Sequence, residues 1–363
     1  MTSFDEVLKD CTKLGTKIPT SEYLENGKYP IIDQGQNDIA GYYDSDDGLF
    51  EDVPTIVFGD HTRVVKYVDK PCFLGADGVK LLCPLDKDIN CKYLFYQLSC
   101  ADIPNTGYNR HFKWVKALNF KIPSSDEQNH VVEVLDKVTE LISLRKQQLA
   151  KLDELVKARF VEMFGNIIRN DKSWPIHNFS DIASSRLGKM LDAKQQTGKY
   201  SYPYLANFNV QWINFNVDNL NQMDFNEAEQ KEFELRDGDL LVCEGGEIGR
   251  CAVWHNEIQP CFFQKALHRV RCNRQLVQPD YLAWWFKYNC NHGGFAEIAG
   301  AKATIAHLPG IKLKQLQVAL PPLSLQNEFA AFVERVDQQK QTVQQSLEKL
   351  ELMKKALMQE YFG

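Results

Sequence analysis

The chain has 363 residues, of which 44% are hydrophobic and 25% charged, a composition typical of a globular protein with two or more domains. No apolar run approaches the roughly 18 residues of a membrane span, and the N-terminus lacks the basic start and apolar core of a signal peptide, so we expect a cytoplasmic protein. The ten cysteines form no CxxC pair and show no zinc-finger spacing, which indicates reduced thiols and argues against a structural zinc site.

The distribution of charge is less simple than the net charge of −6, which by itself argues against a nucleic-acid-binding protein. Residues 1–53 carry 4 basic and 12 acidic side chains, whereas residues 54–123 carry 10 and 6, and residues 240–320 carry 9 and 5. Two mildly basic segments therefore occur in an acidic chain. Each is also compatible with an ordinary solvated face, so charge alone does not decide the function.

The first predicted domain, residues 1–124, contains short apolar strands separated by Gly- and Pro-containing turns. A strand at 55–58 precedes a turn with Arg63, and a short aromatic helix, KYLFYQL, follows two further strands. Three polar stretches of this domain carry side-chain types that contact bases and phosphates. The candidate DNA-binding residues are Gln34, Gln36, Asn37, His61, Thr62, Arg63, Thr106, Tyr108, Asn109, Arg110, His111 and Lys113. The alternative interpretation is a set of solvated turns anchored by aromatic rings.

A long helix is predicted next, over residues 125–165, after the breaker Pro123. Val138 and Leu152 share one heptad register and Leu149 lies in the adjacent one, which is the spacing of a coiled coil. Roughly forty residues at about 1.5 Å rise give a helix of about 60 Å.

The second predicted domain, residues 166–320, repeats the order of the first. A strand at 240–243 precedes the glycine-rich stretch EGGEIG, and the aromatic helix DYLAWWF follows. EGGEIG lacks the GKS/T ending of a phosphate loop, so a tight hairpin turn is the favoured role of its glycines. The candidate DNA-binding residues here are Arg186, Lys189, Asn207, Asn209, Gly246, Arg250, Gln264, Lys265 and Lys302.

The second long helix, residues 321–363, repeats the first. Residues 120–165 and 318–363 align without gaps and are identical at 13 of 46 positions. Val336, Leu347 and Leu350 continue the apolar stripe, so we expect the two helices to pair antiparallel and their stripe residues to be partner-binding positions. The chain is thus an internal repeat of the order domain, helix, domain, helix.

The sequence shows no catalytic signature. We find no methyltransferase glycine motif with an NPPY-type loop, no Walker A motif and no PD…ExK nuclease arrangement. Asp60 and His61 are adjacent, but they lack a second carboxylate or lysine at nuclease spacing. We therefore predict no catalytic residue and no metal site.

Several stretches, duplicated in order, carry a resemblance to a known family: IVFGDHTR, GADGVKLL, TGYNRHFKWVKALNFKIPS, GDLLVCEGGEIGR and GAKATIAHLPGIKLKQLQVALPPL. With the helices that follow them, they resemble the specificity (S) subunit of Type I restriction–modification systems over essentially the full length. The resemblance implies a mixed α/β (α+β) fold with two target-recognition domains separated by two long antiparallel coiled-coil helices. The two halves differ at GYNRHF and AKATIAHL, which implies two different half-sites.

The resemblance also implies a function. The chain would be a non-catalytic subunit that recognises a bipartite, asymmetric target in double-stranded DNA. Two methyltransferase (M) subunits would dock on its helices and restriction/translocase (R) subunits would join them, so S-adenosylmethionine, ATP and Mg²⁺ would belong to those partners. The alternative is a coiled-coil adaptor whose globular domains bind other proteins.

Overall fold

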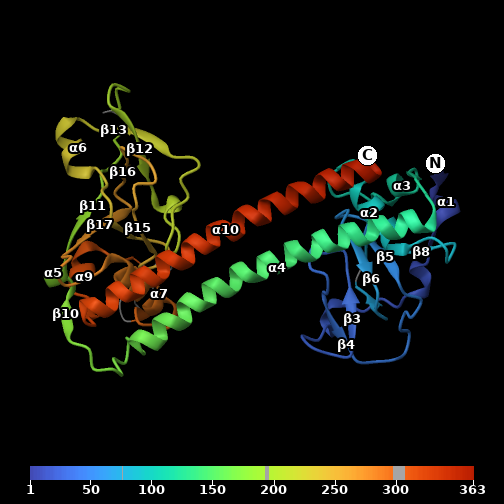
Figure 1. Cartoon of the computed structure of the whole chain (residues 1–363), viewed down its shortest axis with the longest axis horizontal. Helices are drawn as coiled ribbons and strands as arrows, with labels where there is room; N and C mark the ends of the chain where they lie inside the picture. Colours follow the sequence, from blue (N-terminus) through green and yellow to red (C-terminus); the bar gives the residue numbers. More distant parts are fainter. Residues whose placement is uncertain (76, 193–195, 297–306) are drawn as a thin grey trace. The chain divides into compact units, whose positions relative to one another are not determined.

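The computed structural model describes residues 1–75, 77–192, 196–296 and 307–363. The chain divides into two compact units: unit 1 consists of Met1–Gln148 and Val343–Gly363, and unit 2 consists of Leu149–Thr342. Each unit contains one strand-rich domain and a part of both long helices (Figure 1).

The domain of unit 1 contains two larger sheets and the antiparallel pair β1–β9. Its strands are β1 (Thr2–Ser3), β2 (Leu8–Asp10), β3 (Tyr29–Ile32), β4 (Gly41–Tyr43), β5 (Thr55–Gly59), β6 (Val65–Val68), β7 (Phe73–Leu74), β8 (Val79–Pro84) and β9 (Asn119–Phe120), and its short helices are α1 (Phe4–Val7), α2 (Cys91–Cys100) and α3 (Phe112–Val115). One sheet is antiparallel with the order β2-β8-β5-β6, and the other has the order β4-β3-β7, in which β3 and β7 run parallel. All of β5 is buried, as its continuous apolar sequence requires.

The domain of unit 2 has the same topology. Its strands are β10 (Ile176–Asn178), β11 (Ala183–Leu187), β12 (Ser201–Leu205), β13 (Asn221–Asp224), β14 (Leu240–Cys243), β15 (Cys251–Val253), β16 (Phe262–Phe263), β17 (Leu267–Cys272) and β18 (Gln317–Ala319), and its helices are α5 (Phe179–Ile182), α6 (Glu227–Phe233), α7 (Pro279–Asn291) and α9 (Gly310–Lys314). The sheet orders β11-β17-β14-β15 and β13-β12-β16 match those of unit 1 strand for strand, including the parallel pair β12–β16. The internal repeat inferred from the sequence is therefore a repeat of the fold.

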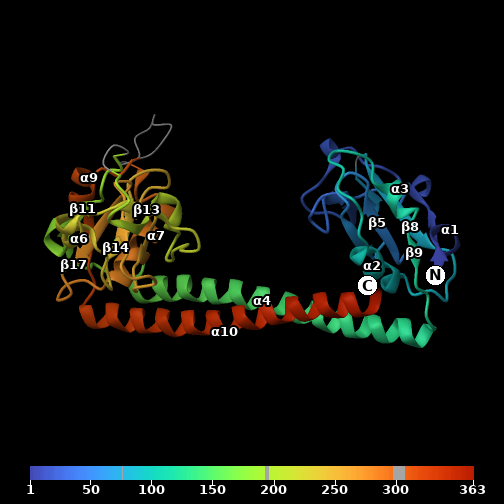
Figure 2. The same ribbon diagram turned by 90° about the horizontal axis from the view of Figure 1, so that it is seen from above.

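The two long helices are α4 (Ser125–Phe164) and α10 (Leu323–Phe362). Within each unit they run antiparallel, because rising residue numbers on one helix meet falling numbers on the other (Figure 2). The ion pairs across the helices are Asp153–Lys340 at 2.7 Å and Arg159–Glu328 at 2.8 Å in unit 2, and Lys146–Glu351 at 3.1 Å in unit 1. The predicted fold class, mixed α/β domains with long antiparallel helices, is confirmed.

The stripe residues face the interior. Val138, Val336 and Leu347 are 5%, 3% and 6% exposed, and Leu149, Leu152 and Leu350 are half-buried. A buried side chain has no surface to offer a separate protein, so the three buried residues stabilise the chain's own packing. A partner would have to contact the outward faces of the helices.

A buried glutamine near the start of each long helix joins that helix to its domain. Gln128 and Gln326, 198 residues apart, are 2% and 0% exposed. Each side-chain Oε1 accepts a hydrogen bond at 2.9 Å from a backbone N–H next to the domain's aromatic helix, that of Asn90 or of Gln278. Each Nε2 donates to a proline carbonyl, that of Pro123 at 2.9 Å or of Pro321 at 2.7 Å. Both halves of the repeat thus contain a buried glutamine that hydrogen-bonds the long helix to its domain.

The repeated Phe-Gly at the helix ends has a matching role. In unit 2 the ring of Phe164, at the end of α4, lies 4.8 Å from that of Tyr281 on α7 at an angle of 70°. In unit 1 the ring of Phe362, at the end of α10, lies 5.3 Å from that of Tyr93 on α2 at 65°. Each domain therefore packs against the start of one long helix and the end of the other, which accounts for the same helix end occurring twice.

Candidate nucleic-acid interface

In unit 1, the loop after β3 is hydrogen-bonded to the turn after β5. Gln34 accepts at its side-chain Oε1 from the His61 N–H at 3.2 Å and at its backbone oxygen from Thr62 Oγ1 at 2.6 Å. Its Nε2 donates to the Asp77 carbonyl at 3.0 Å. The stretch that contains Gln34 and the stretch that contains His61 and Thr62, each a candidate from the sequence, are therefore adjacent.

The third stretch, before α3, is attached to the same turn through Asp60. This carboxylate is 3% exposed, and its Oδ1 accepts from the Phe112 N–H at 2.7 Å. The Asp60 carbonyl accepts from the backbone N–H of His111 at 2.8 Å and lies 2.9 Å from its ring Nδ1. The His61 ring contributes a further contact, with Nδ1 lying 3.2 Å from the Asn109 carbonyl. The structure thus brings the three candidate stretches of the first domain together on one surface.

The candidates of unit 1 differ in how accessible they are. Gln36, Asn37, Arg110 and Lys113 are exposed. Tyr108 is 86% exposed and stacks on His61, with ring centroids 4.6 Å apart and an angle of 9° between the planes. These side chains can reach a ligand directly.

Other candidates of unit 1 hold the surface in place. His111 is fully buried, and its Nε2 lies 3.3 Å from Thr106 Oγ1. Asn109 donates from its side chain to the Thr106 carbonyl. Arg63 has a left-handed backbone, with φ of 61°, and donates from Nη1 to the Ile103 carbonyl at 3.0 Å. Their contacts give these residues a supporting role.

In unit 2, the loop after β12 lies against the turn after β14. Asn207 donates from Nδ2 to the Gly245 carbonyl at 2.8 Å, and the Arg250 guanidinium donates to the Asn207 carbonyl at 3.1 Å and to its side-chain oxygen. Asn209 is 2% exposed and its Oδ1 accepts from the Ala206 N–H at 2.9 Å, so it holds the loop. Gly246 has φ of 84° in the turn between the antiparallel strands β14 and β15, the hairpin role predicted for the glycines.

Two basic candidates of unit 2 are already paired within the chain. Lys189 donates to Glu229 and to the Asp224 carbonyl, both at 2.6 Å, and its side chain is only 11% exposed. Arg186 forms an ion pair with Glu232. These contacts neutralise both cations and leave less of their charge for a phosphate.

Two further candidates, Gln264 and Lys265, follow β16 and contact the ends of neighbouring segments. The Gln264 N–H donates to the Leu205 carbonyl at 3.0 Å, and the Lys265 N–H donates to the Lys189 carbonyl at 2.9 Å. The Lys265 side chain is exposed. Lys302 lies outside the described residues. Some candidates of each domain therefore lie at the same place in the fold, after β3 and β5 in one and after β12 and β14 in the other.

Some residues of this surface were missed by the sequence analysis. Phe208 is 58% exposed in the loop after β12, and Met190 is 62% exposed, with its sulfur 3.6 Å from Lys265 Nζ. An apolar side chain inside a polar loop was the available signal. The supporting role of Asp60 had no signal, because it depends on a backbone N–H 52 residues further along the chain.

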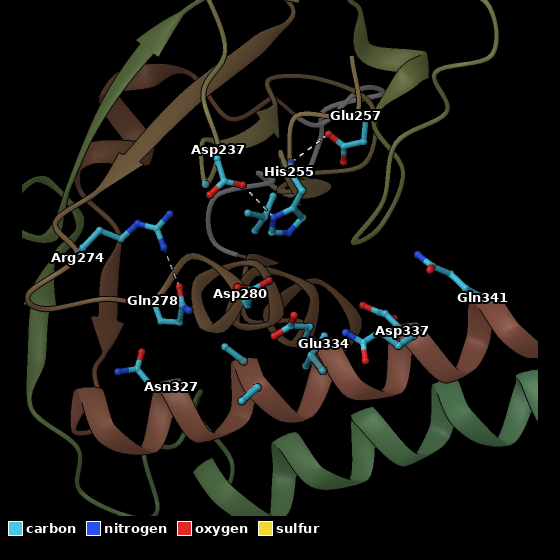
Figure 3. A pocket seen from close by; sticks show the side chains of 16 residues that line it. Asp237, His255, Glu257, Arg274, Gln278, Asp280, Asn327, Glu334, Asp337 and Gln341 are labelled. Carbon is cyan, nitrogen blue, oxygen red and sulfur yellow. Dashed lines mark hydrogen bonds and ion pairs between the residues drawn. The ribbon is translucent and has the colours of Figure 1, made fainter. Parts of the chain in front are cut away.

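A hollow of about 860 Å³ on the α10 side of unit 2 is unsuited to nucleic acid (Figure 3). Its charged lining includes Asp237, Glu257, Asp280, Glu334 and Asp337 against Arg274 and His255. Burial raises the pKa of Asp280 and of Asp337 above the usual range. Carboxylates repel phosphates, so this hollow is not part of the nucleic-acid interface.

Within the described ranges, the chain has no cluster of three or more His, Cys, Asp or Glu placed to bind a metal ion. Among the same residues, no helix is both long and apolar enough to span a bilayer. The ten cysteines are free thiols.

Comparison with known proteins identifies relatives. The family model described as Type I restriction modification DNA specificity domain matches residues 5–154 and 171–352. The putative type I restriction enzyme MjaX specificity subunit of Methanocaldococcus jannaschii is 23% identical over 195 residues, which cover 53% of this chain and 46% of the relative. The putative type I restriction enzyme specificity subunit S.HindORF215P of Haemophilus influenzae is 23% identical over 261 residues, which cover 69% of this chain and 65% of the relative. The chain thus spans about half to somewhat under two thirds of the length of these relatives.

Solved structures extend the likeness to the fold. The Type I restriction–modification S subunit from M. genitalium matches with a TM-score of 0.63 at 16% identity, covering 99% of this chain and 95% of that one. A structure described by its complex assembly and conformational transition in the type I R-M system matches with a TM-score of 0.53 at 13% identity, covering 98% and 94%. The likeness concerns the whole chain and not one domain alone.

Proposed function

Because the chain belongs to the Type I restriction modification DNA specificity family, we propose that it is the DNA-recognition subunit of a Type I restriction–modification complex. The observation that carries the proposal is the duplicated site. Two domains of one topology gather polar and basic side chains at the same place in the fold, with different residues in each. Each domain would recognise one half of a bipartite, asymmetric sequence in double-stranded DNA.

The exposed side chains of unit 1 suit this role. Arginine and lysine donate to guanine in the major groove, and amide side chains pair with adenine. Arg110, Lys113, Gln36 and Asn37 supply these groups, and all four side chains are exposed, as is Tyr108. A tightly bonded scaffold beneath them, with Asp60 and His111 buried, reduces the conformational entropy that binding would cost.

In this function the catalytic reactions would be carried out by other subunits of the complex. Asp60 is buried and bonded to a backbone N–H, so it is unsuited to bind a catalytic metal ion or activate water. Two methyltransferase subunits would bind the outward faces of α4 and α10, and restriction/translocase subunits would complete the complex. S-adenosylmethionine, ATP and Mg²⁺ would be bound by those partners, in the cytoplasm, where the DNA is.

The test exchanges one domain. A chain whose residues 1–124 come from another family member is expressed with its methyltransferase subunit, and methylated adenines are mapped by sequencing. One half-site is expected to change while the other stays the same. If both half-sites changed together, the domains would not recognise DNA independently. If the chain bound a protein partner in a salt-insensitive way and showed no sequence-selective DNA binding, the adaptor alternative would replace the proposal.

A further inference from the structure

The loop after β12 of unit 2 presents an exposed aromatic ring at the candidate interface. Residues Asn207–Asn209 form a single 3₁₀ turn, and Phe208 at its centre is 58% exposed. Its neighbours on either side are half-buried and buried. Resting on the proposed function, we propose that Phe208 recognises a thymine of the second half-site, by contact with the C5-methyl group of that base in the major groove.

Hydrogen bonds hold the turn on both sides of Phe208. The Asn207 carbonyl accepts from the Arg250 guanidinium at 3.1 Å. Asn209 donates from Nδ2 to the Asn216 carbonyl at 3.0 Å, and the Asn216 N–H donates to the Asn209 carbonyl at 2.8 Å. A turn fixed in this way presents the ring in one position, so contact with a ligand costs little conformational entropy.

The polar side chains next to the ring are bonded within the chain. Asn207 donates from Nδ2 to the Gly245 carbonyl at 2.8 Å, and its side-chain oxygen accepts from Arg250. Gln211 donates from Nε2 to the Phe208 carbonyl at 2.9 Å. The Arg250 side chain is only 20% exposed. The most exposed group of this turn is therefore an apolar ring and not a hydrogen-bonding side chain.

The ring of Phe208 takes no part in the core of its domain. Among the described residues, it belongs to none of the hydrophobic clusters of unit 2 and to none of the close aromatic pairs. Phe215, a few residues further on, shows the contrast, since its ring lies 5.2 Å from that of the buried Trp254. Because burial of an apolar ring is favourable, Phe208 would gain free energy by contact with another molecule.

The equivalent position in unit 1 is a glycine. Ile32 of β3 corresponds to Leu205 of β12, because each is the last residue paired with the parallel neighbour of its strand. Three residues further on, Gly35 therefore corresponds to Phe208. Gly35 has no side chain to contact a base, and the exposed ring of unit 1, that of Tyr108, comes from the segment before α3. Phe208 is thus one of the differences between the two halves, which is where different half-sites would be distinguished.

The chemistry of the ring favours one group of the DNA. Against a phosphate or a hydrogen-bonding base edge, an apolar ring would displace water without providing a hydrogen bond in return. The C5-methyl group of thymine is an apolar group exposed in the major groove, and phenylalanine is one of the side chains that contact it. A methyl contact also carries sequence information, because it distinguishes thymine from the other bases at that position.

The experiment removes the methyl group and the ring separately. The full chain, in complex with its methyltransferase subunits, binds duplex oligonucleotides that carry the mapped target, and fluorescence anisotropy at fixed salt measures the affinity. The second half-site is the one that exchange of residues 1–124 leaves unchanged. Each of its thymines, on either strand, is replaced in turn by deoxyuridine, which lacks only the C5-methyl group. At one position this replacement should weaken wild-type binding by about 4-fold, the effect of one buried methyl group.

Two variants of Phe208 test the ring. Phe208→Ala should bind the thymine duplex at least about 4-fold more weakly than the wild type does, and it should no longer distinguish thymine from deoxyuridine at that position. Phe208→Leu retains an apolar side chain and should keep part of the discrimination. Ile176→Ala is the matched control, because Ile176 is also 58% exposed in unit 2 but lies on β10, outside the candidate interface. Circular dichroism and the thermal unfolding temperature should stay at the wild-type values in all three variants.

The outcomes separate this proposal from the proposed function. If the wild-type complex bound its target selectively, but no deoxyuridine replacement affected the wild type more than Phe208→Ala, the thymine contact would be overturned and the proposed function would stand. An equal loss of affinity in Phe208→Ala for the target and for unrelated duplexes would also overturn it, since the ring would then contact DNA irrespective of sequence. If the wild-type complex did not distinguish its target from unrelated DNA, the proposed function would fail, and the thymine contact with it.

Discussion

Replacing Asp60 by alanine should loosen the recognition surface of unit 1. The carboxylate is 3% exposed, and its Oδ1 accepts from the Phe112 N–H at 2.7 Å. Phe112 is 8% exposed, so its N–H would have little access to water once the acceptor is removed. A hydrogen bond to a charged group contributes about 1.5–3 kcal/mol, and the free energy of unfolding of unit 1 should fall by about that amount.

The matched control is Asp60→Asn, which keeps an oxygen at the Oδ1 position and removes only the charge. Its loss should be smaller, about 1 kcal/mol or less, because the Phe112 N–H keeps its acceptor. Urea denaturation followed by circular dichroism measures both variants, with the transition of unit 1 analysed separately from that of unit 2.

DNA binding provides the functional measurement. Because Asp60 connects the turn after β5 to the segment that carries Tyr108 and Arg110, Asp60→Ala should also weaken sequence-selective binding, by about 10-fold if about 1.4 kcal/mol of ordering is lost. Fluorescence anisotropy at fixed salt measures this affinity. Wild-type stability together with wild-type affinity in Asp60→Ala would show that Asp60 does not support the surface.

Three further predictions concern other parts of the chain. Arg110→Ala should cost about 1–3 kcal/mol in DNA binding and relax one position of the first half-site, whereas a uniform loss over all sequences in a binding-selection assay would indicate a phosphate contact. Gln326→Ala and Gln128→Ala should each lower the free energy of unfolding of their own unit by about 1–3 kcal/mol, since each leaves a half-buried backbone N–H without its acceptor; equal urea midpoints for variant and wild type would contradict this. Inserting one heptad after Gln148 and another after Thr342 lengthens each helix by about 10 Å, which is the length of about three base pairs of DNA. Methylation mapping should then show a longer spacer between the half-sites, while the half-sites themselves stay unchanged.

The architecture could be predicted from the sequence because the patterns that indicate it, the internal repeat and the heptad spacing, extend over many residues. Thirteen identities in 46 aligned positions 198 residues apart and heptad spacing over about four heptads are hard to produce by chance, and both describe helices that the structure contains. The strands could be located because continuous apolar runs such as those of β5 and β14 are buried on both faces. The fold therefore depended on periodic patterns that a single sequence displays.

The candidate site could be predicted only in part, because the availability of a side chain depends on contacts distant in sequence. Lys189 and Arg110 are both basic residues in polar stretches, yet Lys189 is neutralised by Glu229, 40 residues further on, while Arg110 is exposed. Asn209 and His111 have the right chemistry for base contacts, but both are buried. Residue type points to candidate loops, and the tertiary structure decides which of their side chains face solvent.

The two halves of the chain also permit a comparison within one molecule. Gln128 and Gln326, which are identical in the two halves, are buried and connect the domains to the helices. Positions at the tips of equivalent strands differ, with Gln34 after β3 and Asn207 after β12, and both take part in the candidate surface. Two identical recognition surfaces related by a two-fold axis would favour a palindromic target. Two different surfaces on one repeated scaffold favour instead a target whose halves differ, so the asymmetry of the proposed DNA site follows from differences at the loops and not from differences in the fold.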